Sequence, residues 1–143
     1  MRLFLDANVI FTAAHNPDGR ASSLFELARH GRCELSTSPH AATEAGRNLR
    51  LKYPEAAGRL EGLMRLMTME AEAARADVDW ALDQRLPLKD APVLAAAVAC
   101  RAGALVTGDR AHFGHLFGRR VRHLRVITPA EALALVLGDL RER

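Results

Sequence analysis

The sequence has few aromatic side chains, few cysteines and no apolar run as long as a membrane span. Phenylalanine, tyrosine and tryptophan make up only 5% of its 143 residues, which disfavours a surface that binds nucleic acid mainly by base stacking. The two cysteines, Cys33 and Cys100, are not in a CxxC pair and have apolar neighbours, so we expect two buried thiols. Met1-Arg2 leads directly into the first expected strand, which leaves no room for a signal peptide. These absences predict a cytoplasmic protein that does not contact a membrane.

Size and charge are those of an ordinary globular protein. Apolar residues account for 49% of the chain and charged residues for 26%, and the formal net charge is +3. Such a charge permits a polyanionic partner without requiring one. Among the 20 basic residues only Lys52 and Lys89 are lysine. The chain is long enough for a full hydrophobic core and no linker or repeat divides it, so we expect one domain over 1–143 with a frayed tail at 138–143.

Apolar periodicity alternates between strand-like runs and helical spacing along the chain. Strands are expected at 2–5, 33–37, 104–107 and 121–127. Helices are expected at 7–14, 22–30, 39–52, 54–69, 69–85, 91–102 and from 129 onward, with a helical turn and loop at 110–118. This alternation predicts an α/β fold, in which helices cover both faces of a mostly parallel sheet of about four to five strands.

Three of the expected helices have distinctive patterns. The helix at 54–69 carries apolar residues at helical spacing that we interpret as core or dimer-interface side chains, with a candidate self-association face at Leu60, Met64 and Met67. The acidic segment 69–85 is interpreted as a solvated helix that Trp80 anchors to the core. The helix at 91–102 is apolar nearly all round, which predicts a central, buried position.

Carboxylates stand where two expected strands end, just before one expected helix and inside another. Asp6 follows the first strand, and Asp109 follows the strand at 104–107. Asp90 precedes the most apolar helix, and Glu44 lies about one and a half turns into the helix at 39–52. Because the carboxyl ends of parallel strands meet at one edge of a sheet, these side chains can converge there. Crowded carboxylates repel one another and need a cation, and Mg²⁺ and Mn²⁺ suit oxygen ligands. This set of residues therefore suits metal-assisted phosphodiester hydrolysis.

Each carboxylate also has an ordinary structural explanation. Asp6 and Asp90 are candidate helix N-caps, and Asp109 is a candidate turn or cap residue. Glu44 can form an exposed pair with Arg47 one turn later. The apolar surroundings of Asp6 and Asp90 favour a shared functional role over these separate ones.

The order of these motifs resembles that of the PIN-domain ribonucleases. Asp6-Ala7-Asn8, Glu44, Asp90 before an alanine-rich helix, and Thr107-Gly108-Asp109 look like the acidic quartet of that family. The Ile-Thr-Pro-Ala-Glu ending at 127–131 is typical of bacterial members related to VapC-type toxins. The resemblance spans residues 3 to about 137. It implies a PIN-like three-layer α/β/α sandwich whose quartet binds one or two Mg²⁺ or Mn²⁺ ions and cleaves single-stranded RNA.

The resemblance also implies a role for each matching residue. Asp6, Asp90 and Asp109 would be the metal ligands, and Glu44 would complete the catalytic set. Asn8 and Thr107 would be polar supports. Many family members carry a further Asp three positions after the one that matches Asp109, but this chain has His112 there, so the number of metals stays open.

Basic and histidine residues supply further candidates. His112 and His115 are three residues apart, but a zinc site usually needs three or four convergent ligands, which disfavours zinc. The basic run from 119 to 125 is either a patch for RNA phosphate or a solvated strand edge. The candidate phosphate contacts are Arg47, Arg50, Arg110, Arg119 and Arg120.

The leading hypothesis is a Mg²⁺- or Mn²⁺-dependent endoribonuclease that is the toxin component of a type II toxin–antitoxin pair. The resemblance implies a small cognate antitoxin and a homodimer as partners. The alternative is a catalytically silent PIN domain that binds RNA or protein, which the altered residue His112 motivates. A phosphotransferase of the haloacid-dehalogenase kind is disfavoured, because such enzymes need an Asp two residues after the nucleophile and Asn8 stands there.

Overall fold

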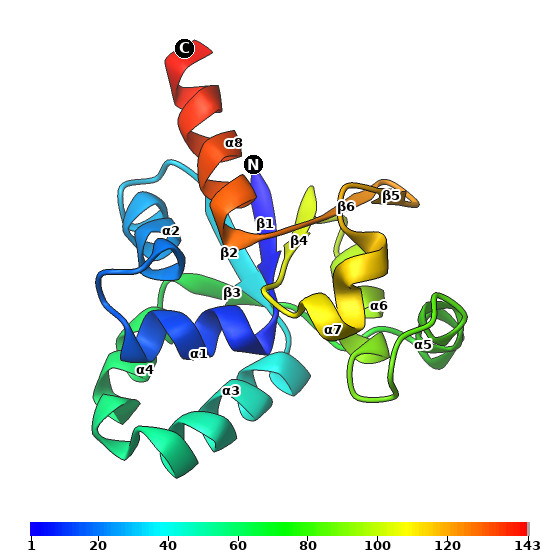
Figure 1. Ribbon diagram of the computed structural model, residues 1–143, viewed down its shortest axis with the longest axis horizontal. Coiled ribbons are helices and arrows are strands. Elements are labelled where there is room, and N and C mark those ends of the chain that lie inside the picture. Colours follow the sequence, from blue (N-terminus) through cyan, green and yellow to red (C-terminus); the bar gives the residue numbers. More distant parts are fainter. Residues whose placement is uncertain (143) are drawn as a thin grey trace.

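The computed structural model describes the backbone of residues 1–142 and the side chains of residues 1–138. Within these residues, a six-stranded sheet has the order β3-β2-β1-β4-β6-β5 (Figure 1). The strands are β1 (Arg2–Leu5), β2 (Glu34–Thr37), β3 (Met67–Met69), β4 (Ala104–Val106), β5 (Arg120–Val121) and β6 (Leu124–Ile127). All neighbouring pairs are parallel except β5 and β6. The predicted α/β fold with a mostly parallel sheet is confirmed, with six strands instead of four to five.

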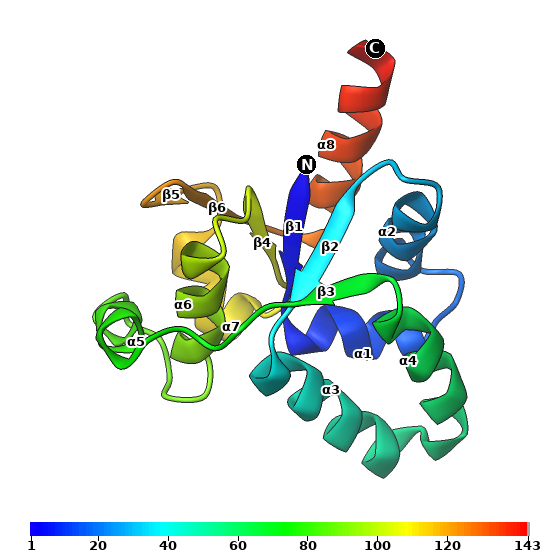
Figure 2. The same cartoon turned by 180° about the vertical axis from the view of Figure 1, so that it is seen from behind.

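Helices lie on both faces of the sheet (Figures 1 and 2). They are α1 (Ala7–His15), α2 (Arg20–Arg29), α3 (Pro39–Lys52), α4 (Ala57–Met64), α5 (Arg75–Leu82), α6 (Ala91–Ala99), α7 (Arg110–Phe113) and α8 (Pro129–Glu142), with 3-10 turns η1 (Pro54–Ala56) and η2 (Gly114–Leu116). Helix α1 packs with α2, α3 and α4, and α2 packs with α8, whereas α5 packs with α6. Parallel neighbours need crossover connections, and the helices of these connections cover the two faces of the sheet.

The central strands are apolar because both of their faces are covered. Leu3, Phe4 and Leu5 of β1 and Leu105 and Val106 of β4 are fully buried. Buried parallel strands have continuous apolar runs of this kind rather than alternating patterns. Helix α6 is also buried along most of its length, as its sequence predicts, and its alanines allow close approach to its neighbours. The strands that carry the site are thus rigid at their carboxyl ends.

The prediction of one helix over 54–69 is wrong for the second half of that segment. Helix α4 ends at Met64, and Met67–Met69 forms strand β3 at the edge of the sheet. Met67 pairs with Leu35 of β2, and the backbone N–H of Glu70 donates to Thr37 O over 2.8 Å. Pairing with β2 therefore overrides the helical spacing. Met67 does not share a helical face with Leu60 and Met64, so the face proposed for self-association does not exist in that form.

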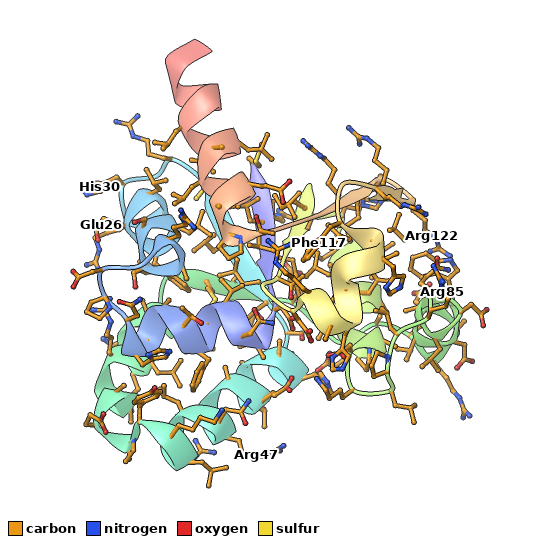
Figure 3. All side chains as sticks on the ribbon, in the orientation of Figure 1. Glu26, His30, Arg47, Arg85, Phe117 and Arg122 are labelled. Carbon is orange, nitrogen blue, oxygen red and sulfur yellow. The ribbon has the colours of Figure 1, made fainter. Side chains whose placement is uncertain are left out.

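The strand predicted at 121–127 is a hairpin of β5 and β6. Arg122, between the two strands, has a φ of 58°, the left-handed conformation that a tight turn requires. Its guanidinium lies 3.8 Å from the centre of the ring of Trp80, a residue of α5. Figure 3 shows Arg122 beside this helix. Trp80 is packed against the core as predicted, but the helix around it is shorter than the expected 69–85.

Several smaller expectations have clear outcomes. Helix α3 spans the predicted residues, because Ser38 caps it with a side-chain bond to Ala41 N and Pro39 occupies the first helical turn. Cys33 is buried, whereas Cys100 is only half-buried. The backbone of 138–142 is helical, and residue 143 of the expected frayed tail lies outside the described residues. Over the part of the chain that the structure describes, no helix is long and apolar enough to cross a membrane.

Candidate metal centre

Four carboxylates from four different segments line one cleft at the carboxyl ends of β1 and β4. The cleft has a volume of about 420 Å³. In Figure 1 this edge of the sheet faces α1 and α3. The carboxylates that line it are those predicted from the sequence, Asp6, Glu44, Asp90 and Asp109. The structure therefore brings together the residues that the sequence suggested would converge.

Asp6 is held rigidly by its own helix and by the neighbouring strand. It is the N-cap of α1, and its Oδ1 accepts a hydrogen bond of 2.8 Å from Ala7 N. Its Oδ2 accepts bonds from Asn8 Nδ2 at 2.8 Å and from Thr107 Oγ1 at 2.7 Å. Burial raises the pKa of Asp6 to about 6, although the bonds from Thr107 and Ala7 lower it. The negative charges of Asp90 and Glu44 contribute smaller increases to the same raised pKa. Asp6 therefore caps α1 and also lines the cleft.

Asn8 and Thr107 join the two strand ends. Asn8 Nδ2 donates to Thr107 Oγ1 over 3.1 Å, and Asn8 Oδ1 accepts from Gly108 N over 2.8 Å. Thr107 Oγ1 also accepts from Asp109 N over 3.1 Å, so it bonds to the carboxylate of Asp6 and to the backbone of Asp109. The polar supports suggested by the sequence thus fix the distance between the loops that carry Asp6 and Asp109.

Asp90 is the most deeply placed carboxylate of the cleft, with 2% of its surface exposed. Its Oδ1 accepts a hydrogen bond of 3.1 Å from Lys89 Nζ. Within residues 1–142, no hydrogen bond of good geometry reaches its Oδ2. His112 Nδ1 lies 3.1 Å from this oxygen, but it also lies 2.8 Å from Asp109 Oδ2, and one ring N–H can point at only one of them. A buried carboxylate oxygen is thus left for another partner.

The donor atoms fit a divalent cation. Asp90, Asp109 and His112 each offer a ligand atom, and these atoms all lie within 4.8 Å of one another. The unpartnered Oδ2 of Asp90 is aimed into this group. Buried carboxylate oxygens of this kind are the ligands that Mg²⁺ and Mn²⁺ accept, and a cation offsets their mutual repulsion. The residues present therefore fit a divalent metal ion.

Comparison of the sequence with protein families identifies the family of this chain. The sequence profile described as the PIN domain matches residues 2–111, well over half of the chain. The chain belongs to the PIN domain family. No curated protein matches the sequence significantly.

Solved structures with the same fold resemble this PIN domain along most of its length. PAE2754 from Pyrobaculum aerophilum has a TM-score of 0.70 and 18% identity over 96% of this chain and 90% of its own. VapBC2 from Rickettsia felis, bound to a promoter DNA fragment, has a TM-score of 0.64 and 16% identity over 90% of this chain and 98% of its own. VapC20 from Mycobacterium tuberculosis has a TM-score of 0.57 and 14% identity over 76% of this chain and 91% of its own. At these identities the likeness shows a shared fold.

Lys89 is a residue of this PIN domain site that was not predicted from the sequence. Its Nζ lies 3.1 Å from Asp90 Oδ1 and 3.9 Å from Glu44 Oε1. Burial lowers the pKa of Lys89, but the hydrogen bond to Asp90 and the nearby carboxylate charges outweigh this, so the pKa is raised. The two lysines of the chain, Lys52 and Lys89, both line the cleft.

The predicted phosphate contacts fall into two groups. Arg47 lies on the outer side of α3 (Figure 3) and lines a hollow beside Glu44 and Lys89. Arg50 is exposed on the same helix, and Arg110 directly follows Asp109. These three arginines flank the cleft or the helices that form it.

Arg119 and Arg120 belong to the opposite end of the sheet. Arg120 pairs with Arg125 of β6, which pairs with Ala104 at the start of β4. The carboxylates gather where β4 ends, so Arg120 lies toward the amino end of that strand. Neither Arg119 nor Arg120 is among the described residues that line the cleft. The hairpin does not bring them to the site.

His115 does not join His112 in a common site. Its Nε2 lies 2.7 Å from the backbone oxygen of Gln84, and it is outside the group of potential ligands formed by Asp90, Asp109 and His112. The pair of histidines therefore gives no support to a zinc site.

Proposed function

We propose that this PIN domain is a Mg²⁺- or Mn²⁺-dependent endoribonuclease that hydrolyses phosphodiester bonds of single-stranded RNA. The observation that carries the proposal is the convergence of Asp6, Glu44, Asp90 and Asp109 in one cleft. When bound there, a divalent ion polarises the scissile phosphate and lowers the pKa of the attacking water. The family membership of the chain supports the same activity.

The residues of the cleft have different roles, which depend on how deeply each one is buried. The buried Asp6 and Asp90, together with Asp109, would hold the cation. Glu44 has 26% of its side chain exposed and faces the same cleft, so it can orient water or accept its proton. Asn8 and Thr107 keep Asp6 in one orientation.

The RNA strand would follow the cleft away from the carboxylates. Phe11 and Thr12 of α1 and Asn48 and Lys52 of α3 line its continuation. Lys52 Nζ lies 5.6 Å from the centre of the Phe11 ring, which places a positive charge beside an aromatic face. A phosphate next to the scissile one can contact Lys52, and the exposed Arg47 adds positive charge at the rim.

A test compares cleavage of a single-stranded RNA by purified wild-type protein, Asp6→Asn and Asp90→Asn, with Mn²⁺ or Mg²⁺ present. Both variants should lose cleavage and keep their circular dichroism spectrum. The wild-type products should carry 5′-phosphate and 3′-hydroxyl ends. Asp79→Asn, at an exposed position of α5, is the matched control and should cleave normally. Metal-dependent cleavage retained in both site variants would refute the assignment.

A role as a toxin of a toxin–antitoxin pair is part of the proposal. It is supported by the shared fold with VapBC2 from Rickettsia felis and with VapC20, described as a sarcin-ricin loop cleaving toxin. The expected partner is a small antitoxin, and the expected assembly is a homodimer. Induction of the wild type should arrest growth, and induction of Asp6→Asn should not. Light scattering of the purified protein tests the dimer, and a small open reading frame directly upstream would supply the antitoxin for co-purification.

A catalytically silent PIN domain that binds RNA or protein is the second candidate. One observation favours it: Lys89 and His112 already pair with the carboxylates of the cleft. Calorimetric titration with Mn²⁺ separates the two functions. Absence of binding at millimolar Mn²⁺ would favour the silent domain, whereas a saturable site that Asp90→Asn removes would favour the nuclease.

A further inference from the structure

His112 stands at the centre of the carboxylate group rather than at its edge. Its Nδ1 lies 2.8 Å from Asp109 Oδ2 and 3.1 Å from Asp90 Oδ2. The backbone of His112 is fixed as well, because its N–H donates to Asp109 Oδ1 over 3.1 Å at the start of α7. The ring is therefore presented to both carboxylates by the helix that Asp109 caps.

Hydrogen bonding alone leaves this arrangement incomplete. A ring N–H that donates to Asp109 Oδ2 cannot also donate to Asp90 Oδ2. Asp90 Oδ2 receives no hydrogen bond from the described residues, and the Asp90 side chain is almost fully buried. A buried carboxylate oxygen without a partner is unfavourable. A cation in place of the ring proton would contact all three atoms at once.

The spacing of the three atoms suits cation ligands. Adjacent ligands of an octahedral ion with bonds of about 2.1 Å lie roughly 3 Å apart. The two separations from Nδ1, 2.8 and 3.1 Å, agree with this value. An imidazole nitrogen is a softer donor than a carboxylate oxygen, and it is less suited to Mg²⁺ than to first-row transition ions, a series that begins with Mn²⁺.

We propose that His112 Nδ1 is a direct ligand of the divalent cation, together with Asp90 and Asp109, and that it gives the site a preference for Mn²⁺ over Mg²⁺. This inference rests on the proposed function, because it concerns the cation of the same cleft. On binding, Nδ1 exchanges its bond to a proton for a bond to the metal. The metal-bound ring is the tautomer that carries its proton on Nε2, and the proton displaced from Nδ1 is exchanged through solvent.

Pulsed electron paramagnetic resonance on the Mn²⁺-loaded full-length protein tests the ligand directly. A nitrogen bound to Mn²⁺ produces a ¹⁴N hyperfine coupling, which changes to the ¹⁵N pattern when histidine is labelled with ¹⁵N. We expect this coupling in the wild type and its loss in His112→Gln. His115→Gln is the matched control, because its ring bonds to the backbone of Gln84 instead, and it should keep the coupling.

Calorimetry supplies the second measurement. In the wild type Mn²⁺ should bind more tightly than Mg²⁺, and His112→Gln should weaken Mn²⁺ binding about tenfold or more. His112→Asp restores an all-oxygen ligand set, so the ratio of Mn²⁺ to Mg²⁺ affinity should fall about tenfold, equivalent to about 1.4 kcal/mol.

The outcomes separate this inference from the proposed function. Saturable Mn²⁺ binding without a ¹⁴N coupling in the wild type would overturn the role of His112 and leave the nuclease proposal standing. An unchanged affinity ratio in His112→Asp would also overturn it. No Mn²⁺ binding at all would overturn both. The wild-type spectrum decides the question even if a variant fails to fold.

Discussion

Lys89 donates a hydrogen bond of 3.1 Å from its Nζ to Oδ1 of Asp90, the next residue in the chain. The same ammonium group lies 3.9 Å from Glu44. In the metal-free protein, Lys89 therefore supplies part of the positive charge that the crowded carboxylates need. A bound divalent ion would supply that charge instead, and it would be repelled by the ammonium group.

Removal of this charge should affect the metal-free and metal-bound proteins in opposite directions. Lys89→Gln should bind Mn²⁺ about fivefold more tightly and unfold about 3 °C lower without metal. The changes are small because half of the Lys89 side chain is exposed and solvent screens its charge. Calorimetry and thermal unfolding in chelator measure the two effects. Lys52→Gln is the matched control, because it removes a charge from the same cleft without breaking a carboxylate pair. A weaker Mn²⁺ affinity in Lys89→Gln would contradict the prediction.

The raised pKa of Asp6 predicts that metal-free stability falls as the pH rises from about 4 to about 6. Burial raises this pKa from 3.8 to about 6, so the folded protein takes up the proton more readily than the unfolded chain. Above pH 6 the charged, buried group costs up to about 3 kcal/mol of unfolding free energy. At lower pH the proton removes that cost, and stability is regained.

Urea unfolding in chelator at several pH values measures this contribution. Asp6→Asn should lose the part of the pH dependence between 4 and 6 that belongs to this carboxyl group, whereas Asp79→Asn should keep it. Saturating Mn²⁺ should stabilise the wild type more at pH 7 than at pH 5, because the ion must compete with the proton at the lower pH. Identical pH profiles for the wild type and Asp6→Asn would show that Asp6 has an ordinary pKa.

Local sequence patterns were enough to predict those helices and strands whose ends are set by residues nearby in the chain. Ser38 and Pro39 define the start of α3, and the apolar run at 3–5 defines β1. Convergence of Asp6 and Asp109 followed from a general property of parallel sheets, that all strand ends share one edge. These features are decided by residues that lie close together in sequence or by topology alone.

Long-range pairing explains what the sequence could not predict. Strand β3 exists because Met67 meets Leu35, thirty-two residues earlier, and no local pattern distinguishes it from the end of a helix. The same holds for Arg120, which the hairpin turns away from the carboxylates. The roles of Lys89 and His112 depend on distances across the cleft, which composition and spacing do not contain.

Thr107 is predicted to be the most sensitive support of the site. Its hydroxyl donates to Asp6 Oδ2 and accepts from Asn8 Nδ2 and Asp109 N, and the residue is fully buried. Thr107→Val keeps the shape but leaves polar groups without partners, so the free energy of unfolding should fall by about 2–3 kcal/mol. The pKa of Asp6 should rise further, because this hydrogen bond lowers it.

Chemical denaturation and the pH profile of stability measure these effects. Thr43→Val, at an exposed position of α3, is the matched control and should change stability by less than about 0.5 kcal/mol. A loss below about 1 kcal/mol for Thr107→Val would mean that water replaces the hydroxyl in this network.

The proposed path of the RNA predicts different effects for two basic residues. Lys52 lines the cleft, whereas Arg120 lies toward the amino end of β4. The measurement uses an Asp90→Asn background, which should not cleave the RNA. In it, Lys52→Gln should weaken the binding of single-stranded RNA. The slope of log affinity against log salt concentration should become shallower by about 0.7, because one phosphate contact is lost. Arg120→Gln should change neither quantity beyond the small effect of net charge. Fluorescence anisotropy between about 50 and 200 mM salt measures both the affinity and its salt dependence.

Equal losses in the two variants would show that RNA binds through the overall charge of the protein rather than along the cleft. A loss confined to Arg120→Gln would place the strand on the hairpin.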